Sequence, residues 1–170
     1  MNVYSAGVLL YMKRNNITYF LLGKDCKYDS WSDFGGKTDD KDRRDPLKTA
    51  SREFYEETCG VIFPLSDIFS LLLKEGHVIE CKSYKKNQYF MVLLKLPEKY
   101  INESSTIINH FKFQNILINL KPSEVMRSFR EKSELRWFTL DEITNAKMKI
   151  RGVFFYSLMQ NLNRIKQICA

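Results

Sequence analysis

One stretch, residues 35–60, most constrains what this chain can fold into. Three glutamates, Glu53, Glu56 and Glu57, stand there at positions i, i+3 and i+4. On an α-helix, at about 100° per residue, this spacing gathers the three carboxylates within an arc of roughly 100°. The stretch therefore predicts a helix with one strongly acidic side, preceded by a polar loop.

Capping signals bound this helix, and an apolar side flanks the acidic one. Asp45 is a favoured N-cap, Pro46 suits the first helical position, and Gly60 is typical of a residue just past a helix end. The apolar stripe beside the acidic arc consists of Leu47, Ala50 and Phe54. One edge of the helix is thus expected to pack on a core while the next presents acid.

The acidic arc is either a solvated surface or a binding site for a cation. Like charges on one helix face repel each other, which makes a solvated face the simpler interpretation. However, the double glycine Gly35-Gly36 places a backbone turn ahead of the helix. Hard divalent cations prefer oxygen ligands of this kind, and Mg²⁺ commonly shares its shell with substrate phosphates. We therefore interpret the arc as a metal site.

The same residues resemble the Nudix box of the Nudix hydrolase family, over Gly36–Val61. Arg52 to Glu57 (REFYEE) matches the catalytic core of that pattern, and Gly60-Val61 matches its closing pair. Three departures stand out: a loop two residues longer, Asp42 where the pattern has Glu, and one extra residue, Cys59. The first two leave Asp42 and Asp45 as alternative partners of Arg52.

This resemblance implies an α/β/α sandwich, with a mixed β-sheet between helices, and a divalent-metal-dependent hydrolase. Glu53, Glu56 and Glu57, with a backbone carbonyl at Gly35 or Gly36, would bind Mg²⁺ or Mn²⁺. Glu53, Glu56 and Arg52 would be catalytic, with Arg52 expected to make a bidentate contact to Glu56. The general base is either a box glutamate or a distant one, for which Glu131 and Glu134 are candidates and Glu134 is preferred.

The resemblance also implies substrate contacts outside the acidic arc. Lys37, just after the double glycine, would meet a substrate phosphate. In the family, the loop that precedes the box often helps to hold the substrate, so Lys24, Tyr28 and Trp31 are further candidates. An aromatic face can stack on a base and an ammonium can meet phosphate. The alternative for Trp31 is core packing.

The remaining pattern predicts strands before and after the box helix and helices toward the C-terminus. The expected strands are residues 3–11 and 17–22, paired as a hairpin, then 31–34, 77–81, 88–96 and 133–140. The expected helices are 106–120, a short piece at 122–129, a turn from Asp141, and one long helix over 151–168. Residues 65–73 mix periods and are left undecided. The loop 37–44 alternates charges and is expected to be solvated.

Length and composition predict a single domain over residues 1–170, with about 97–130 as an insertion. No apolar run is long enough for a membrane span, and no secretory pattern opens the chain. The four cysteines show no metal-binding or disulfide framework, which favours reduced thiols and a cytoplasmic location.

The formal net charge of +7 favours a phosphate-rich substrate, because the surplus cations must lie outside the acidic arc. A nucleoside diphosphate linked to another group is the first candidate substrate. Capped RNA is the main alternative, with the basic segment 82–86 as a possible contact, and inositol pyrophosphates are a third. A non-catalytic nucleotide-binding module is the alternative to an enzyme.

Overall fold

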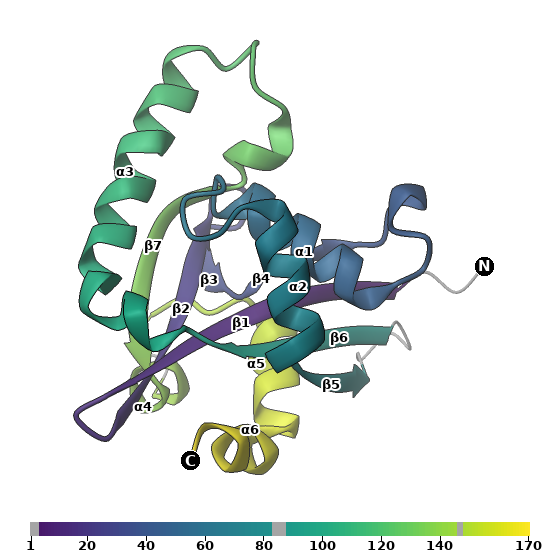
Figure 1. Ribbon diagram of the computed structural model, residues 1–170, viewed down its shortest axis with the longest axis vertical. Coiled ribbons are helices and arrows are strands. Elements are labelled where there is room, and N and C mark those ends of the chain that lie inside the picture. Colours follow the sequence, from purple (N-terminus) through teal and green to yellow (C-terminus); the bar gives the residue numbers. More distant parts are fainter. Residues whose placement is uncertain (1–3, 83–87, 146–147) are drawn as a thin grey trace.

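The computed structural model describes residues 4–82, 88–145 and 148–170, which form a mixed β-sheet between two layers of helices (Figure 1). The central sheet order is β3-β2-β1-β6-β5, with β4 paired to β1 and β7 paired to β2. The strands are β1 (Tyr4–Arg14), β2 (Ile17–Asp25), β3 (Ser30–Ser32), β4 (Phe34–Lys37), β5 (His77–Lys82), β6 (Gln88–Lys95) and β7 (Lys132–Thr139). The predicted α/β/α sandwich is confirmed.

The helices divide between the two faces of the sheet. They are η1 (Asp40–Asp42), α1 (Pro46–Glu57), α2 (Leu65–Glu75), η2 (Glu98–Glu103), α3 (Ser104–Leu120), η3 (Arg127–Arg130), α4 (Leu140–Thr144), α5 (Gly152–Gln160) and α6 (Leu162–Cys169). One core cluster joins α1, α2 and α3 to the sheet, and a second joins α4, α5 and α6 to it. Residues 65–73, which the sequence left undecided, are helical and belong to α2.

The predicted hairpin between the first two strands is confirmed. β1 and β2 pair antiparallel, with Tyr11 opposite Phe20 and Arg14 opposite Ile17. The turn residues Asn15 and Asn16 both have positive φ, 50° and 61°. Asn tolerates this conformation, and two such residues give a turn whose twist matches that of the strands.

The single strand expected over residues 31–34 is two strands, and the sheet forks there. β3 pairs with β2, whereas β4 pairs with β1, and Asp33 lies between them. The pairing of β4 with β1 sets Gly35 opposite Gly7, and a Cβ on Gly35 would lie 2.7 Å from the Gly7 Cα. Only glycine permits this approach, which fixes the double glycine against β1.

The expected C-terminal helix over 151–168 is wrong, because it breaks into α5 and α6 at Asn161. The Asn161 side chain donates to the Ser157 carbonyl at 2.9 Å and to the Cys81 sulfur at 3.4 Å. An Asn side chain bonded locally in this way competes with helix continuation. The break turns α6 so that Ile165 enters the second core cluster.

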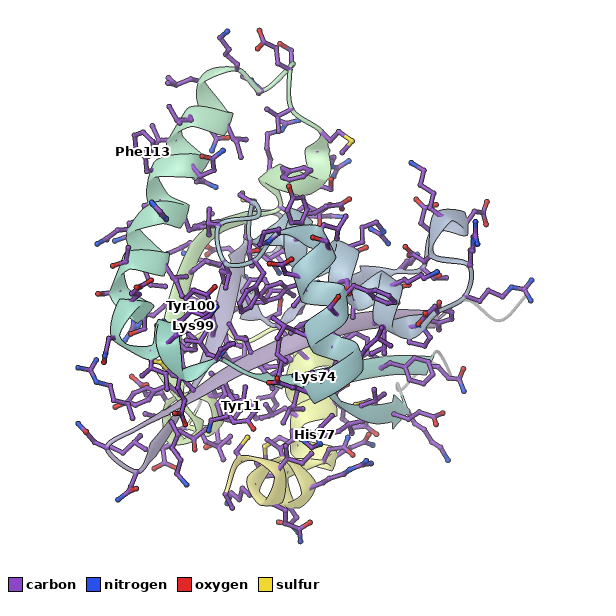
Figure 2. All side chains as sticks on the ribbon, in the orientation of Figure 1. Tyr11, Lys74, His77, Lys99, Tyr100 and Phe113 are labelled. Carbon is purple, nitrogen blue, oxygen red and sulfur yellow. The ribbon has the colours of Figure 1, made fainter. Side chains whose placement is uncertain are left out.

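Residues 97–130 form η2, α3 and η3, and α3 stands beside β7 at one side of the sheet (Figure 1). Ile107 and Phe111 of α3 are buried in the first core cluster, whereas Phe113 points outward and is 61% exposed (Figure 2). The helical piece expected over 122–129 is confined to η3.

Within the described residues, no helix combines the length and apolar character that crossing a bilayer requires. The four cysteines are free thiols, with Cys81 and Cys169 buried. Of the basic segment 82–86, only Lys82 belongs to the described residues.

Candidate active site

The box helix begins and ends where the capping residues predict. The Asp45 side chain accepts a hydrogen bond from the Leu47 amide at 2.9 Å, and Pro46 is the first helical residue. After Glu57 the chain leaves the helix, and Gly60, at φ 64°, donates to the Tyr55 carbonyl at 2.8 Å. The apolar stripe faces the core, with Ala50 and Phe54 in the first core cluster, and Glu53 lies against Gly36 of β4.

The loop before the helix is largely exposed, as expected, but Asp42 within it is buried. Asp42 is only 4% exposed, and its Oδ2 accepts from the Asp39 amide and from the Thr49 hydroxyl, both at 2.9 Å. Burial works to raise the pKa of Asp42, but these bonds and Arg52 outweigh it, so its pKa lies below the ordinary value. Asp42 is therefore an ionised anchor at the helix.

Arg52 is held by Asp42, which resolves the choice between Asp42 and Asp45. The Arg52 Nε lies 3.1 Å from Asp42 Oδ1 and Nη2 lies 2.9 Å from Oδ2, a bidentate ion pair. The remaining Nη1 reaches Glu53 Oε1 at 2.8 Å and Glu56 Oε2 at 3.5 Å. The bidentate contact expected with Glu56 is wrong, since the guanidinium instead bridges from Asp42 to two box glutamates.

Glu53 packs directly on the double glycine. A Cβ on Gly36 would lie 2.5 Å from the carboxylate atoms of Glu53, so glycine leaves the room that this carboxylate occupies. Burial raises the pKa of Glu53 to about 7 against the lowering effect of Arg52, and nearby Glu56 and Glu131 raise it further. The positive charge of Arg52 is therefore too small to offset the effects of burial and of the neighbouring carboxylates on this pKa.

Glu57 is 3% exposed and lies against a buried lysine from β7. Lys132 Nζ is 3.4 Å from Glu57 Oε1, 3.9 Å from Asp25 Oδ2 and 2.9 Å from the Ser32 hydroxyl oxygen. The other oxygen, Oε2 of Glu57, is buried without a hydrogen-bond partner. Burial raises the pKa of Glu57 to about 8, with Lys132 lowering it and Glu53 raising it.

The donor set fits a hard divalent cation by its chemistry. Within the described residues, no three His, Cys, Asp or Glu side chains already converge on one point as metal ligands. Nevertheless, Glu53, Glu56 and Glu57 offer only oxygen donors, and Glu57 Oε2 has no partner. A bound cation would supply the charge that the raised pKa values of Glu53 and Glu57 show to be lacking.

Of the two distant glutamates, Glu131 and not the preferred Glu134 lies near the box carboxylates. Glu131 raises the pKa of both Glu53 and Glu57 by its charge. Glu134 instead stands opposite Lys24 in the β2–β7 ladder and lines a different cavity. The two glutamates are three residues apart. The sequence predicted the start of β7 one residue late and gave no signal that would separate them.

A cavity of about 170 Å³ adjoins the double glycine and is here named the box cavity. Its lining residues come from β1, the fork, β6 and α5: Ser5, Asp33, Gly35, Gly36, Lys37, Tyr89, Arg151, Val153 and Phe154. Lys37 and Arg151 are its cations and Asp33 is its one carboxyl group, so its lining carries more basic than acidic side chains.

Sequence reasoning missed Asp33, Tyr89, Arg151 and Lys132. Tyr89 donates a hydrogen bond to the buried Asp33, whose pKa burial raises to about 6 against the effects of Tyr89, Lys132 and Arg151. Asp33 stands just before the box, whereas Tyr89, Lys132 and Arg151 are far from it in sequence and reach it through the pairing of the strands. The one signal available was a charged residue, Asp33, inside the short strand expected over residues 31–34.

Lys24, Tyr28 and Trp31 lie outside the lining of the box cavity. Lys24 pairs with Asp29 at 2.9 Å. Trp31 is 8% exposed and packs edge-on against Phe138, with ring centroids 4.9 Å apart, which favours its core alternative. The exposed Tyr28 reaches the site only indirectly, with the Arg151 guanidinium 4.9 Å from its ring centroid.

Comparison with known proteins gives matches in structure alone. No protein-family model matches the sequence, and no curated protein matches it. Among solved structures, Caenorhabditis elegans Ap4A hydrolase superimposes with a TM-score of 0.54 at 18% identity, covering 100% of both chains. A putative NUDIX hydrolase from Listeria monocytogenes gives 0.52 at 16% identity, covering 96% of this chain and 94% of that one.

A third similar structure is the NUDIX domain of Shewanella oneidensis NrtR, complexed with ADP ribose. Its TM-score is 0.53 at 10% identity, covering 100% of this chain and 90% of that chain. Similarity at such low identity concerns the arrangement of strands and helices, and the residues of this chain must carry any argument about chemistry.

Proposed function

We propose that this chain, which has the Nudix fold, is a divalent-metal-dependent hydrolase of pyrophosphate bonds. The substrate would be a nucleoside diphosphate linked to another group, such as a nucleotide or a dinucleoside polyphosphate. One observation carries the proposal: Glu53, partly buried, and Glu57, fully buried, have raised pKa values on one helix, and Glu53 packs on Gly36, which lines the box cavity. Such perturbed carboxylates beside a cavity are typical of catalytic sites.

Glu53, Glu56 and Glu57 would hold Mg²⁺ or Mn²⁺, with the Gly36 carbonyl as a further oxygen ligand. Bound there, the cation would neutralise the pyrophosphate and lower the pKa of an attacking water. The chain's own residues orient these ligands. Arg52, anchored by Asp42, fixes Glu53 and Glu56, and Lys132 fixes Glu57.

In the proposed reaction, water attacks one phosphorus, the bond from that phosphorus to the bridging oxygen breaks, and the other phosphate leaves with the bridging oxygen. The water proton passes to a glutamate, either one of the box or Glu131, whose charge acts on Glu53 and Glu57. Lys37 and Arg151 would meet the phosphates from the box cavity. Each phosphate contact offsets charge that otherwise repels the nucleophile.

The comparisons support a nucleotide substrate over the alternatives. The names of two similar structures mention Ap4A and ADP ribose, and both compounds contain a nucleoside linked through a phosphate chain. The basic segment 82–86, which favoured capped RNA, lies outside the described residues except for Lys82. We keep a single domain over residues 1–170 and a cytoplasmic location as part of this proposal.

The proposal is tested by exchanging one ligand. Glu56→Gln keeps the size of the side chain but removes a charge from the metal site. We expect it to lower turnover by more than the roughly 10- to 100-fold typical of outer-shell partners. Phosphate release would be measured with Mg²⁺ and Mn²⁺ on nucleotides, dinucleoside polyphosphates, inositol pyrophosphates and capped RNA.

Glu75→Gln is the matched control, because Glu75 is exposed at the end of α2. It removes the same charge and should leave turnover unchanged. If the wild type hydrolyses none of these compounds, or if Glu56→Gln is as active as the wild type, hydrolysis at this site is wrong.

A further inference from the structure

A second, larger cavity lies between α3, β7 and the end of the β1–β2 hairpin, and is here named the α3 cavity. Its volume is about 650 Å³, within the range of ligand-binding sites. It shares no lining residue with the box cavity. Ser5 lines the box cavity and Arg14 the α3 cavity, and these ends of β1 are roughly 30 Å apart along the strand. The α3 cavity is therefore separate from the proposed active site.

The inner wall of the α3 cavity is apolar and aromatic. Met12 and Leu135 are buried there, and Tyr19, Ile108 and Trp137 are half-buried against the first core cluster. The indole nitrogen of Trp137 donates to the Ser104 carbonyl at 3.2 Å, so its polar atom is satisfied and its ring is fixed. A fixed aromatic ring with its hydrogen bond already made is a stacking surface for another planar ring.

The rim of the α3 cavity is cationic. Arg14, Lys112 and Arg136 are exposed along it, against one carboxylate, Glu134. Arg136 is partly occupied, since it lies 3.7 Å from Glu142 and over the Phe138 ring. Within residues 4–82, 88–145 and 148–170, neither Arg14 nor Lys112 has an ion-pair partner.

We propose that the α3 cavity is a second ligand site, which binds a nucleoside phosphate with its base on Trp137 and Tyr19 and its phosphate at Arg14 and Lys112. An aromatic wall beside unpaired cations matches a ligand that is planar and apolar at one end and anionic at the other. The binding needs no metal, because the rim itself carries the compensating charge.

The test uses ADP as the probe, in buffer with EDTA, so that the box carboxylates have no cation with which to recruit phosphate. Titration calorimetry should show ADP binding to the wild type, and Arg14→Ala/Lys112→Ala should weaken that binding at least tenfold. Lys74→Ala/Lys166→Ala is the matched control, because it removes two exposed cations far from the cavity lining and should bind as the wild type does.

Three outcomes would overturn the proposal: no binding of ADP to the wild type, equal loss in both double variants, or loss only in Lys37→Ala/Arg151→Ala. Equal loss would show general attraction by the net charge, and the last result would place ADP in the box cavity. Thermal unfolding of each variant checks that the fold is intact.

A second measurement reports on the cavity itself. In a Trp31→Phe background, Trp137 is the only tryptophan, and ADP should change its emission. Asn109→Glu places a carboxylate on the cavity lining and should abolish the change, whereas His110→Glu, one residue along α3 and off the lining, should not. An emission that ADP leaves constant would contradict stacking on Trp137.

This inference is independent of the hydrolysis proposed above. Arg14→Ala/Lys112→Ala should hydrolyse substrate with Mg²⁺ as the wild type does, because neither residue lies in the box. Failure of the wild type to hydrolyse any substrate would overturn the proposed function and leave the ADP titration in EDTA unaffected.

Discussion

A single guanidinium connects the loop and the helix of the candidate active site. Arg52 takes both oxygens of Asp42 with one edge and reaches Glu53 and Glu56 with its remaining nitrogen. Lysine has one compact charge and lacks this planar fork, so the exchange is not conservative at such a position.

Arg52→Lys should therefore keep the fold but loosen the two glutamates. We expect hydrolysis and Mg²⁺ affinity to fall by about 10- to 100-fold, the usual effect of losing an outer-shell partner. The measurements are kcat/KM and a Mg²⁺ titration. Arg44→Lys, an exposed neighbour in the same loop, is the control. Equal activity of Arg52→Lys and the wild type would contradict the assigned role.

Gly36→Ala should separate activity from stability. The added Cβ would meet the Glu53 carboxylate at 2.5 Å, and this carboxylate is the free end of a flexible side chain that can move away. A ligand displaced by about 1 Å can cost roughly 100-fold in rate, so turnover should fall by about that factor while the unfolding temperature changes little.

Gly152→Ala is the control for this change. A Cβ at Gly152 meets no atom within 4 Å, and the residue opens α5, so turnover and fold should both be retained. Unfolding of Gly36→Ala at a much lower temperature than the wild type would show that the glycine serves the fold instead of Glu53.

Among the elements, α3 is the long helix for which the resemblance to the Nudix family gave no counterpart. It lies within the segment expected as an insertion, yet Phe111 is fully buried in the first core cluster. Phe113, two residues along, points to solvent (Figure 2). The helix therefore contributes to the core on one side only.

Phe111→Ala should lower the free energy of unfolding by about 3–5 kcal/mol, as expected for removing a buried phenylalanine. Phe113→Ala should change it by less than about 0.5 kcal/mol, because its ring is largely exposed. Urea unfolding monitored by circular dichroism measures both. Similar values for the two variants would mean that α3 is not part of the cooperative core.

Local signals determined which elements the sequence revealed. Asp45 and Pro46 act on the residues next to them, so the start of α1 was predictable. In α2 the buried residues Ile68 and Leu72 share a face, but Leu65 and Leu73 are exposed, and these obscure the helical period. The helix break at Asn161 depends on contacts made only in the folded chain.

Only the part of the candidate site that lies on one helix was predictable from the sequence. Glu53, Glu56 and Glu57 lie on one helix, and their spacing sufficed to bring them together. Asp42, close in sequence, was one of the two partners that the pattern left open for Arg52. Asp33 and Lys132 reach the site through the fork of the sheet and the β2–β7 pairing, and Arg151 through the bridge between Trp31 and Ile150, which no local pattern encodes.

At the scale of the whole molecule, the buried carboxylates should make the stability of the metal-free protein depend on pH. Glu53 and Glu57 have pKa values of about 7 and about 8 in the folded state, against an ordinary value of 4.5. Between these values the folded chain binds more protons than the unfolded chain, so the free energy of unfolding falls as pH rises from 5 to 8.

Urea unfolding in EDTA at pH 5, 6, 7 and 8 measures this slope. Glu53→Gln should flatten it over pH 5–7, and excess Mg²⁺ should restore stability at pH 8, where the carboxylates are free to bind it. Metal-free stability that rises over this interval would contradict the raised pKa values.

Because Glu57 and Lys132 form a buried ion pair, a substitution at one of them changes the electrostatic energy of the other. Neutralising Lys132 alone would leave the Glu57 carboxylate buried without its counter-ion, a change that typically costs about 3–5 kcal/mol, whereas neutralising Glu57 alone would leave Lys132 with Asp25 at 3.9 Å. Loss of the charge at position 132 is therefore expected to go together with loss of the charge at position 57. A related protein with neutral side chains at both positions would be expected to lack the metal ligand and the activity.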